Sequence, residues 1–311
     1  MSAVDTPRVT SGSYEAVQSQ VLAEAEAGRR RQRRQFVWKS AAANIVVLIF
    51  LVFALFPIYF VIEAAFRPGN SLYSTTLELI PSNPSLENWQ YMFSRHENLD
   101  LLLWMRNSLF VAVLTTVASL AVCTSAAYAF SRWRFRGRDT ILTLMLAINA
   151  FPGVLSLIGV FVIFKQLQLL DNLLGLVLAY TAGTLVFSTW NLKGFFDTIP
   201  VDLEEAARVD GATPTQAFFR IMLPLARPAL AVTALLGFMA GWGEFITAQT
   251  VLFSADKYTA MVGLIGLQSD YRQPWGWFAV GAICMSVPVT ILFLLLQKQL
   301  QAGLTLGGVK G

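Results

Sequence analysis

The sequence predicts an all-α integral membrane protein with six membrane-spanning helices. Of its 311 residues, 55% are hydrophobic and only 14% are charged, whereas soluble domains carry about 25% charged residues. The mean hydropathy is +0.57. Six apolar segments each hold about 20 residues or more, which as helices span the hydrocarbon core of about 30 Å. Because backbone groups in lipid must be hydrogen-bonded within the segment, we expect helices rather than strands.

The six spans are expected at roughly 40–63, 107–130, 140–164, 172–192, 228–252 and 277–297. Pro152–Gly153 and Pro288 lie inside the third and sixth of them and should bend or loosen these helices. Residues 1–39 are polar and contain the basic run "RRRQRR", so we expect a largely disordered tail. Residues 40–311 then form one transmembrane domain.

The distribution of lysine and arginine predicts the orientation. If the N-terminus is cytoplasmic, the inner segments hold 16 of these residues and the outer segments six, with the distant Arg8 left out. Positive charge accumulates on the cytoplasmic side of membrane proteins, so both termini are expected in the cytoplasm. Residues 64–106 would then form a partly helical external cap, 193–227 a cytoplasmic segment, and 298–311 a cytoplasmic C-terminal tail.

Several function classes lack the necessary residues. His96 is the only histidine, and Cys123 and Cys284 both lie in apolar runs, so neither a metal site nor a histidine-based catalytic site is expected. A sequence pI of about 9.2 is compatible with nucleic-acid binding, but no basic stripe interleaved with aromatics accompanies it. We therefore expect no catalytic residues, no metal and no nucleic-acid partner.

Small residues recur at helical spacing in two spans. Ala179 precedes Gly183, and Gly237 precedes Gly241. This spacing lets helix backbones approach closely, either in ordinary bundle packing or in a specific dimer contact. We favour bundle packing.

A polar segment interrupts the apolar chain between the fourth and fifth spans. It reads "DLEEAARVDGATPTQAFFRIMLPLARP" (residues 202–228) and is called here the capped segment. Asp202 is a candidate N-cap, with Glu205 three residues later as in a capping box. Gly211 suits the left-handed position that ends a helix. A second helix is predicted from the start signals Thr213, Pro214 and Gln216.

Two helices this short are marginal in water and need a surface to pack against. One interpretation is an ordered loop that packs on its own bundle. The other is a docking element for a separate cytoplasmic partner.

A resemblance to a known family favours the second interpretation. The stretch "EEAARVDGA", followed by "LP", resembles the EAA motif of permease subunits of binding-protein-dependent ABC importers, and the similarity extends from about residue 40 to the end. The segments "PSNPSLENWQYMF" and "GLTLGGVKG" are similar to the MalG-type group of maltose and maltodextrin permeases. The resemblance implies a MetI-like ABC importer core in a bacterial inner membrane.

It also implies partners and sites. The expected partners are membrane lipid, a second, MalF-like permease, two cytoplasmic MalK-like ATPases that hold ATP and magnesium, and an external solute-binding protein. This chain needs no cofactor itself. The implied ATPase contact consists of Glu204, Glu205, Ala206, Ala207, Asp210, Gly211 and Ala212.

The C-terminal tail is a second implied ATPase contact. "GLTLGGVKG" superficially resembles a phosphate-binding loop, but Val309 occupies the lysine position, so we expect no ATP binding by this chain. The tail residues that would reach between the ATPases are Gly307, Gly308, Val309, Lys310 and Gly311.

Glu244 is the acidic residue that lies deep inside a predicted span. A charge near the middle of the membrane costs at least about 2.5–3.5 kcal/mol, so its side chain should face the bundle interior, a cavity or a partner. A structural hydrogen-bonding role and a place in the transport pathway both remain open. Asn149, Trp190 and Asn191 are weaker candidates of the same kind.

The segment between the fifth and sixth spans is a candidate contact for the binding protein. By resemblance, its early part enters the sugar site of the docked binding protein, and this part comprises Phe253, Ser254, Ala255, Asp256, Lys257 and Tyr258. An aromatic belt at the membrane interface is the alternative, which we prefer for Trp275 and Trp277.

The function expected is that of the permease subunit of an ATP-driven importer for maltose, maltodextrin or a related oligosaccharide. A different sugar, such as trehalose, remains an alternative. A self-sufficient channel or secondary transporter is the rival from another class, although it would not need a capped docking segment and should carry more ionisable groups inside the membrane.

Overall fold

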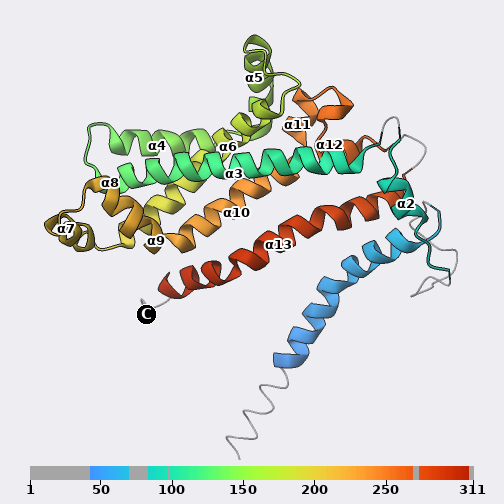
Figure 1. Ribbon diagram of the computed structural model, residues 1–311, viewed down its shortest axis with the longest axis horizontal. Coiled ribbons are helices and arrows are strands. Elements are labelled where there is room, and N and C mark those ends of the chain that lie inside the picture. Colours follow the sequence, from blue (N-terminus) through green and yellow to red (C-terminus); the bar gives the residue numbers. More distant parts are fainter. Residues whose placement is uncertain (1–42, 70–82, 97–98, 269–272, 308–311) are drawn as a thin grey trace, which may run out of the picture. The chain divides into compact units, whose positions relative to one another are not determined.

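The computed structural model describes residues 43–69, 83–96, 99–268 and 273–307, and within them the protein is helical (Figure 1). The extended pairing present in these ranges is an isolated antiparallel bridge between His96 and Leu99. The expected all-α class is confirmed. The predicted N-terminal tail, residues 1–39, lies outside the described residues.

Within these described ranges, four helices are long and apolar enough to cross a membrane: Ala43–Phe66, α3 (Leu101–Arg132), α6 (Leu173–Thr198) and α13, which satisfies these criteria over Trp275–Gln301 and extends to Gly307. Two further candidates are bent pairs. Helices α4 (Arg138–Asn149) and α5 (Gly153–Gln166) meet at 100°, and the helical run Pro214–Leu225 meets α10 (Arg227–Gly243) at 80°. Six spans result if each bent pair is one span.

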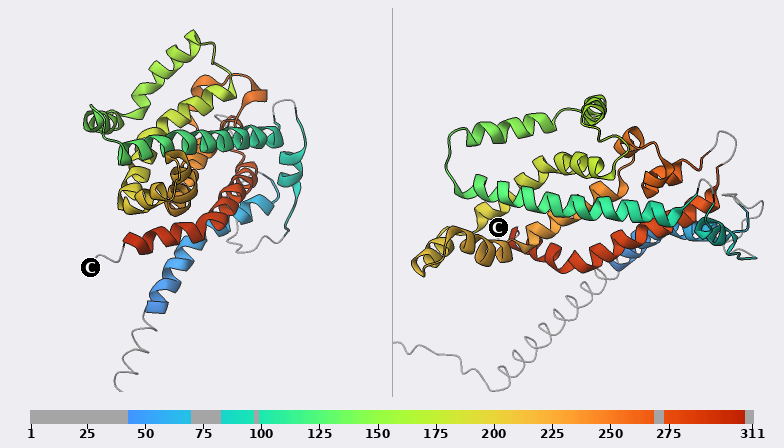
Figure 2. Two further views of the ribbon diagram at one scale, coloured as in Figure 1. Left: turned by 60° about the vertical axis from the view of Figure 1, so that its left-hand side comes forward. Right: turned by 45° about the horizontal axis from the view of Figure 1, so that its top comes forward.

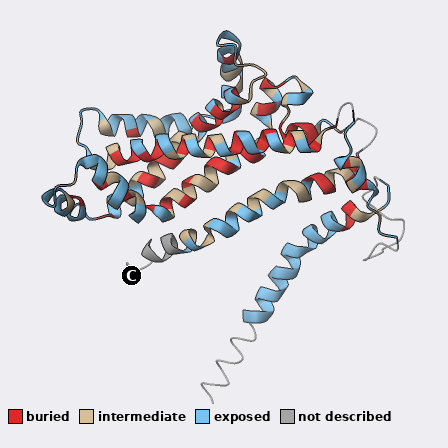
Figure 3. Cartoon of the chain, viewed as in Figure 1, coloured by how far each residue is buried: buried red, intermediate tan, exposed pale blue. Residues whose placement is uncertain are grey.

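The first helix, Ala43–Phe66, carries a long apolar surface. Every residue from 43 to 62 is exposed, as Figure 3 shows. An 18-residue window of this helix has a mean hydropathy of 3.1. Its residues 43–60 belong to one compact unit, and the described residues from Val61 onward belong to another. Such a surface is stable in lipid or against another apolar chain, but not in water.

The break in the first bent pair lies at a proline. Pro152 separates α4 from α5 because it lacks the N–H that would continue the helix. We expected a bend here inside one span; the structure instead has two helices with a sharp turn. In contrast, α13 runs from Trp275 to Gly307 with Pro288 inside it and no break. Proline therefore ends one helix and is tolerated in another.

Helices α3, α6 and α10 pack against one another and form the centre of the bundle (Figures 1 and 2). A Cβ added at Gly241 would lie 2.6 Å from the Ala112 Cα, and one at Gly237 would lie 3.1 Å from the Thr116 Cα. These two glycines therefore let α10 lie directly on α3, which confirms bundle packing at this pair. At Gly183 an added Cβ would meet no atom within 4 Å.

The remaining described elements are short. Between the first helix and α3 lies α2 (Glu87–Phe93), within the predicted cap. After α10 follow α11 (Ile246–Val251), a 3-10 turn (Ala255–Lys257) and α12 (Ala260–Ile265). The capped segment contains α7 (Asp202–Val209), α8 (Pro214–Ala217), the π-helical turn η1 (Phe218–Met222) and α9 (Leu223–Leu225).

Candidate functional site

Helix α7 begins the capped segment, and its start differs from the sequence prediction. Asp202 is already the first helical residue, Val201 is the N-cap, and no side chain caps this end. The predicted capping box of Asp202 and Glu205 is therefore wrong. Both acids still lie in the first turn, where negative charge is favoured by the exposed N–H groups of the helix.

The end of α7 confirms the role predicted for Gly211. This residue has φ +89°, a conformation that is costly for a residue with a Cβ. The Gly211 amide donates to the Arg208 carbonyl at 3.0 Å, and the Ala212 amide donates to the Ala207 carbonyl at 2.9 Å. These two bonds form a Schellman motif, so the turn after α7 has a fixed geometry.

The second predicted cap is also confirmed. The Thr213 hydroxyl accepts from the Gln216 amide, the Gln216 side chain accepts from the Thr213 amide, and Pro214 occupies the first turn. The π-helical turn η1 was not predicted. It directly precedes Leu223–Pro224, where the proline lacks the N–H that a regular helix would use.

The capped segment exposes most of α7. Glu205, Ala206 and Asp210 are exposed, Ala207 and Ala212 are half-buried. Figure 3 shows α7 as an exposed helix at the end of the bundle that also carries α8. Val209 is 87% exposed, a large value for an apolar side chain. Most of α7 is thus uncovered, whereas Phe218 and Met222 of the same segment pack in a core cluster with residues of α3 and α6.

Glu204 is the exception, because it is buried at 2% exposure. Its Oε1 accepts from the Arg132 Nε at 2.5 Å, and its Oε2 accepts from the Tyr128 hydroxyl at 2.8 Å. The resemblance to the EAA motif implies that Glu204 contacts the ATPase. Its carboxylate instead pairs with residues of α3 in the same chain, so the exposed acids of this segment are Asp202, Glu205 and Asp210.

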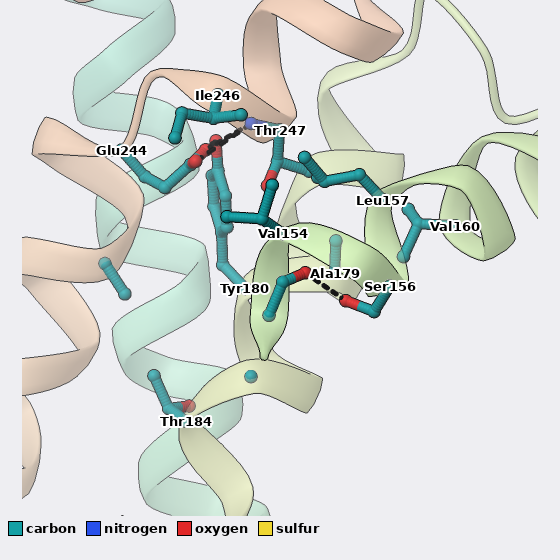
Figure 4. Close-up of a pocket in the computed structure, with 13 residues that line it drawn as sticks. Val154, Ser156, Leu157, Val160, Ala179, Tyr180, Thr184, Glu244, Ile246 and Thr247 are labelled. Carbon is teal, nitrogen blue, oxygen red and sulfur yellow. Dashed lines mark hydrogen bonds between the residues drawn. The ribbon is translucent and has the colours of Figure 1, made fainter. Parts of the chain in front are cut away.

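Glu244 lies where α10 ends and α11 begins. Its carboxylate accepts from the Tyr180 hydroxyl at 2.6 Å and from the Thr247 amide at 2.8 Å (Figure 4). It also accepts from the Ala248 amide at 3.3 Å. The carboxylate therefore caps α11 in the way an N-terminal acid does. The structural hydrogen-bonding role expected for Glu244 is present.

Glu244 also lines a cavity of about 480 Å³. Figure 4 shows that α5, α6 and the region of Glu244 and Thr247 contribute its walls. Apolar side chains and hydroxyl groups share the lining, and its residues include Val154, Ser156, Leu157, Thr184 and Thr247. A mostly apolar wall with a few convergent polar groups is typical of sites for small ligands.

The other pathway candidates lie elsewhere. Asn149 is the last residue of α4 and is exposed. Asn191 is half-buried on α6, and its Nδ2 is buried without a hydrogen-bond partner. Neither residue lines the Glu244 cavity, so the structure does not bring the three candidates together.

The loop Phe253–Tyr258 is held on the bundle by residues far away in the sequence. Asp171 Oδ1 accepts from the amides of Phe253 and Ser254 at 2.9 and 3.0 Å, and its Oδ2 accepts from the Ser254 hydroxyl at 2.5 Å. Burial opposes ionisation of Asp171, but these hydrogen bonds and the Lys257 ammonium outweigh burial and hold its pKa below the usual range.

Side chains of α3 also hold the loop Phe253–Tyr258 in place. The Asn107 Nδ2 donates to the carbonyls of Asp256 and Tyr258 at 2.9 and 3.0 Å. The Trp104 Nε1 donates to the Ala255 carbonyl at 3.2 Å. The loop therefore has a defined shape, while Phe253 remains 56% exposed.

Most of the predicted C-terminal tail contact lies outside the described residues. Gly307 is the last residue of α13, and Gly308, Val309, Lys310 and Gly311 lie outside the described residues. Among the residues that the structure describes, no group of three or more His, Cys, Asp or Glu side chains could hold a metal ion.

Sequence reasoning missed Arg132, Tyr128, Tyr180 and Asp171. Each acts through a partner more than 60 residues away, and spacing along one element does not reveal such a contact. Of these four, only Arg132 carries a signal in the sequence, because it is a charged residue directly after an apolar span.

The helical architecture and the exposed capped segment define a multi-pass membrane protein with an exposed helical surface at one end of its bundle. Residues 119–305 match the family of the binding-protein-dependent transport system inner membrane component. This match spans more than half of the chain, and the chain therefore belongs to that family. The protein is a transport component of the inner membrane and not an enzyme.

Curated relatives extend the match over most of the sequence. The galactooligosaccharides transport system permease protein GanQ of Bacillus subtilis is 39% identical over 270 residues, which is 86% of this chain and 95% of GanQ. The maltose/maltodextrin transport system permease protein MalG of Vibrio vulnificus is 39% identical over 298 residues, 90% of this chain and 99% of that protein. The MalG protein of Escherichia coli is 38% identical over 284 residues, which is 86% of this chain and 95% of that protein.

Solved structures agree on the fold. A bacterial ABC transporter involved in the import of the acidic polysaccharide alginate contains a chain with a TM-score of 0.70 and 21% identity, covering 94% of this chain and 99% of that chain. A chain of the MetNI methionine ABC transporter, in an inward-facing conformation, has a TM-score of 0.52 and 16% identity. The match covers 70% of this chain and 98% of that chain. The MetI-like permease fold implied by the EAA resemblance is thus confirmed.

Proposed function

We propose that this chain is one permease subunit of an ATP-driven importer for an oligosaccharide of the maltose, maltodextrin or galactooligosaccharide kind. The names of the relatives support a sugar cargo, and they differ in which sugar it is. A second, MalF-like permease would complete the pathway. Two MalK-like ATPases would supply ATP hydrolysis, and an external solute-binding protein would deliver the sugar.

The observation that carries the coupling proposal is the exposed, doubly capped surface of the capped segment. A Schellman motif ends α7 and a capping box starts α8. Because the connection between the two helices is hydrogen-bonded, a displacement of α7 would also move α8. Glu205, Ala206, Asp210 and Gly211 lie on the exposed part. We assign the ATPase contact to these residues, with Ala207 and Ala212 at its edge.

Two further sites belong to the same proposal. We assign the Glu244 cavity to the sugar pathway because it joins a carboxylate and hydroxyl groups with apolar walls, a combination that suits a sugar ring. We assign the loop Phe253–Tyr258 to contact with the binding protein, on the opposite side of the membrane from the capped segment, and the tail Gly307–Gly311 to the ATPases.

Gly211→Asp tests the coupling proposal, and Gly137→Asp is its matched control. Both glycines have φ +89°, and around both an added Cβ would meet nothing within 4 Å. The cost to the backbone is therefore the same, but Gly137 lies in the turn between α3 and α4. In a reconstituted complex, Gly211→Asp should lower sugar import about tenfold or more, within the range of coupling free energies of 1–3 kcal/mol, while ATP hydrolysis continues.

The Gly137→Asp variant should import sugar at close to the wild-type rate. Equal import by both variants would remove the coupling role of the Gly211 turn. The channel or secondary-transporter alternative makes a different prediction, since the purified chain would then transport sugar alone and no ATPase would copurify with it.

A further inference from the structure

Arg132 connects the capped segment to two membrane-spanning helices. It is the last residue of α3, and its side chain is 9% exposed. The Nε donates to the Glu204 carboxylate in α7 at 2.5 Å. One terminal nitrogen donates to the Ile199 carbonyl, just after α6, at 2.9 Å and contacts the Met222 sulfur in η1 at 3.9 Å. The Arg132 guanidinium thus links the C-terminal ends of α3 and α6 to both α7 and η1 of the capped segment.

Tyr128 adds a second link from α3, one turn before Arg132. Its hydroxyl donates to the Glu204 Oε2 at 2.8 Å. Its ring lies 4.6 Å from the Phe218 ring in η1 and 6.1 Å from the Phe196 ring in α6, measured between centroids. Both oxygens of the Glu204 carboxylate are therefore held by α3, within an apolar cluster that α6 and η1 also share.

Glu204 is the buried residue of α7. The other side chains of this helix are exposed or half-buried, so the attachment of α7 to the bundle by side chains depends on one carboxylate. An apolar contact would hold α7 in place but allow it to rotate or slide. Two charge-assisted hydrogen bonds from fixed directions also set its orientation.

We propose that Arg132, Glu204 and Tyr128 form the joint that transmits movement of the capped segment to α3 and α6. Glu204 is then a positioning residue inside the chain and not part of the surface that meets the ATPase. A displacement of α7 acts through the Glu204 carboxylate on the C-terminal end of α3. The inference rests on the coupling function proposed above and specifies where the coupling enters the spans.

Glu204→Gln tests the joint. Glutamine has almost the same shape but no charge, so it weakens the bond to Arg132 while leaving the exposed surface of α7 unchanged. The complete complex is reconstituted in liposomes with its ATPases and binding protein. The ratio of sugar imported to ATP hydrolysed should fall about fivefold or more, and the stimulation of ATP hydrolysis by the binding protein should fall with it. The amount of ATPase that copurifies should stay the same.

Glu63→Gln is the matched control. Glu63 is also a buried carboxylate, at 5% exposure, and it pairs with Arg67 one turn later near the end of the first helix. The chemical change and the loss of a buried ion pair are the same, but no contact with the capped segment is involved. The transport ratio should therefore remain near the wild-type value. If the ratio of sugar imported to ATP hydrolysed fell equally in both variants, the fall would reflect a general loss of stability. The proposal that Glu204 transmits movement to α3 would then be wrong.

Tyr128→Phe covers the case in which the Glu204→Gln complex does not assemble. It removes one hydroxyl and keeps the ion pair, so the complex should form with a smaller fall in the ratio. An unchanged ratio in the assembled variants would overturn the joint while leaving the proposed function intact. Failure of the proposed function looks different, because the wild-type chain would then copurify with no ATPase and import no sugar.

Discussion

Glu244 combines a structural role with a position in the wall of the cavity. Its carboxylate satisfies the Tyr180 hydroxyl and two amides at the start of α11, and it also lines the cavity. The sequence identified this residue because a charge in a membrane span is expensive. It did not identify Tyr180, which lies 64 residues away, and it did not predict that the helix ends just before Glu244.

Replacing Glu244 with leucine should reduce transport strongly. The Tyr180 hydroxyl would be buried without a partner, at a cost of about 1–3 kcal/mol, and α11 would lose its cap, at about 0.5–2 kcal/mol. Uptake of labelled sugar, normalised to the amount of assembled complex, measures the effect. We expect a fall of at least about tenfold. Gln249→Leu is the control, because this exposed side chain lies on the same short helix; normal uptake by Glu244→Leu would remove Glu244 from the pathway.

At the scale of elements, short segments held by distant residues are the recurring feature. The loop Phe253–Tyr258 depends on Asp171, Trp104 and Asn107, and α7 depends on Arg132 and Tyr128. Local signals in the sequence predicted the turn at Gly211 and the cap at Thr213 because both are made by neighbouring residues. The same signals misplaced the start of α7 by one residue and missed the supports, which only three-dimensional packing creates.

Asp171→Asn should destabilise the loop in a pH-dependent way. Because the folded-state pKa of Asp171 is lowered, its contribution to stability is full above the ordinary aspartate pKa, about 3.9, and disappears as the pH falls through the lower folded-state value. The melting temperature of the purified complex should therefore be lower for Asp171→Asn at pH 7, and the difference should shrink below about pH 4.

Asp256→Asn is the control for this experiment, since Asp256 lies on the same loop with an exposed side chain. It should melt like the wild type at every pH. A difference between wild type and Asp171→Asn that stays constant into the acidic range would show that charge is not what Asp171 contributes.

At the scale of the whole molecule, composition was sufficient for the class. Apolar length predicted the membrane-crossing candidates found among the described residues, and four of these six candidates are single helices. The first bent pair was expected as one span, 140–164, with a bend at Pro152–Gly153; the fifth span was expected at 228–252, without the preceding run Pro214–Leu225 that forms the second bent pair. Local hydropathy does not show where a helix turns, because the turn depends on the other helices against which each half of the pair packs.

The orientation gives the last prediction. Asp139→Cys and Phe253→Cys place single thiols on exposed positions on opposite sides of the expected membrane, in a chain whose Cys123 and Cys284 are replaced by alanine. In intact cells a membrane-impermeant maleimide should label Phe253→Cys and should label Asp139→Cys only after lysis. The reverse pattern would place the capped segment outside, where no ATPase can reach it.

The two interruptions on either side of the Glu244 cavity have a mechanical consequence. The wall is assembled from ends of helices, Gly153 at the start of α5 and Glu244 between α10 and α11, as well as from the continuous α6. A chamber built in this way can widen or narrow when short pieces pivot about their breaks. The long helices that anchor the molecule in the bilayer need not flex for a cargo to pass.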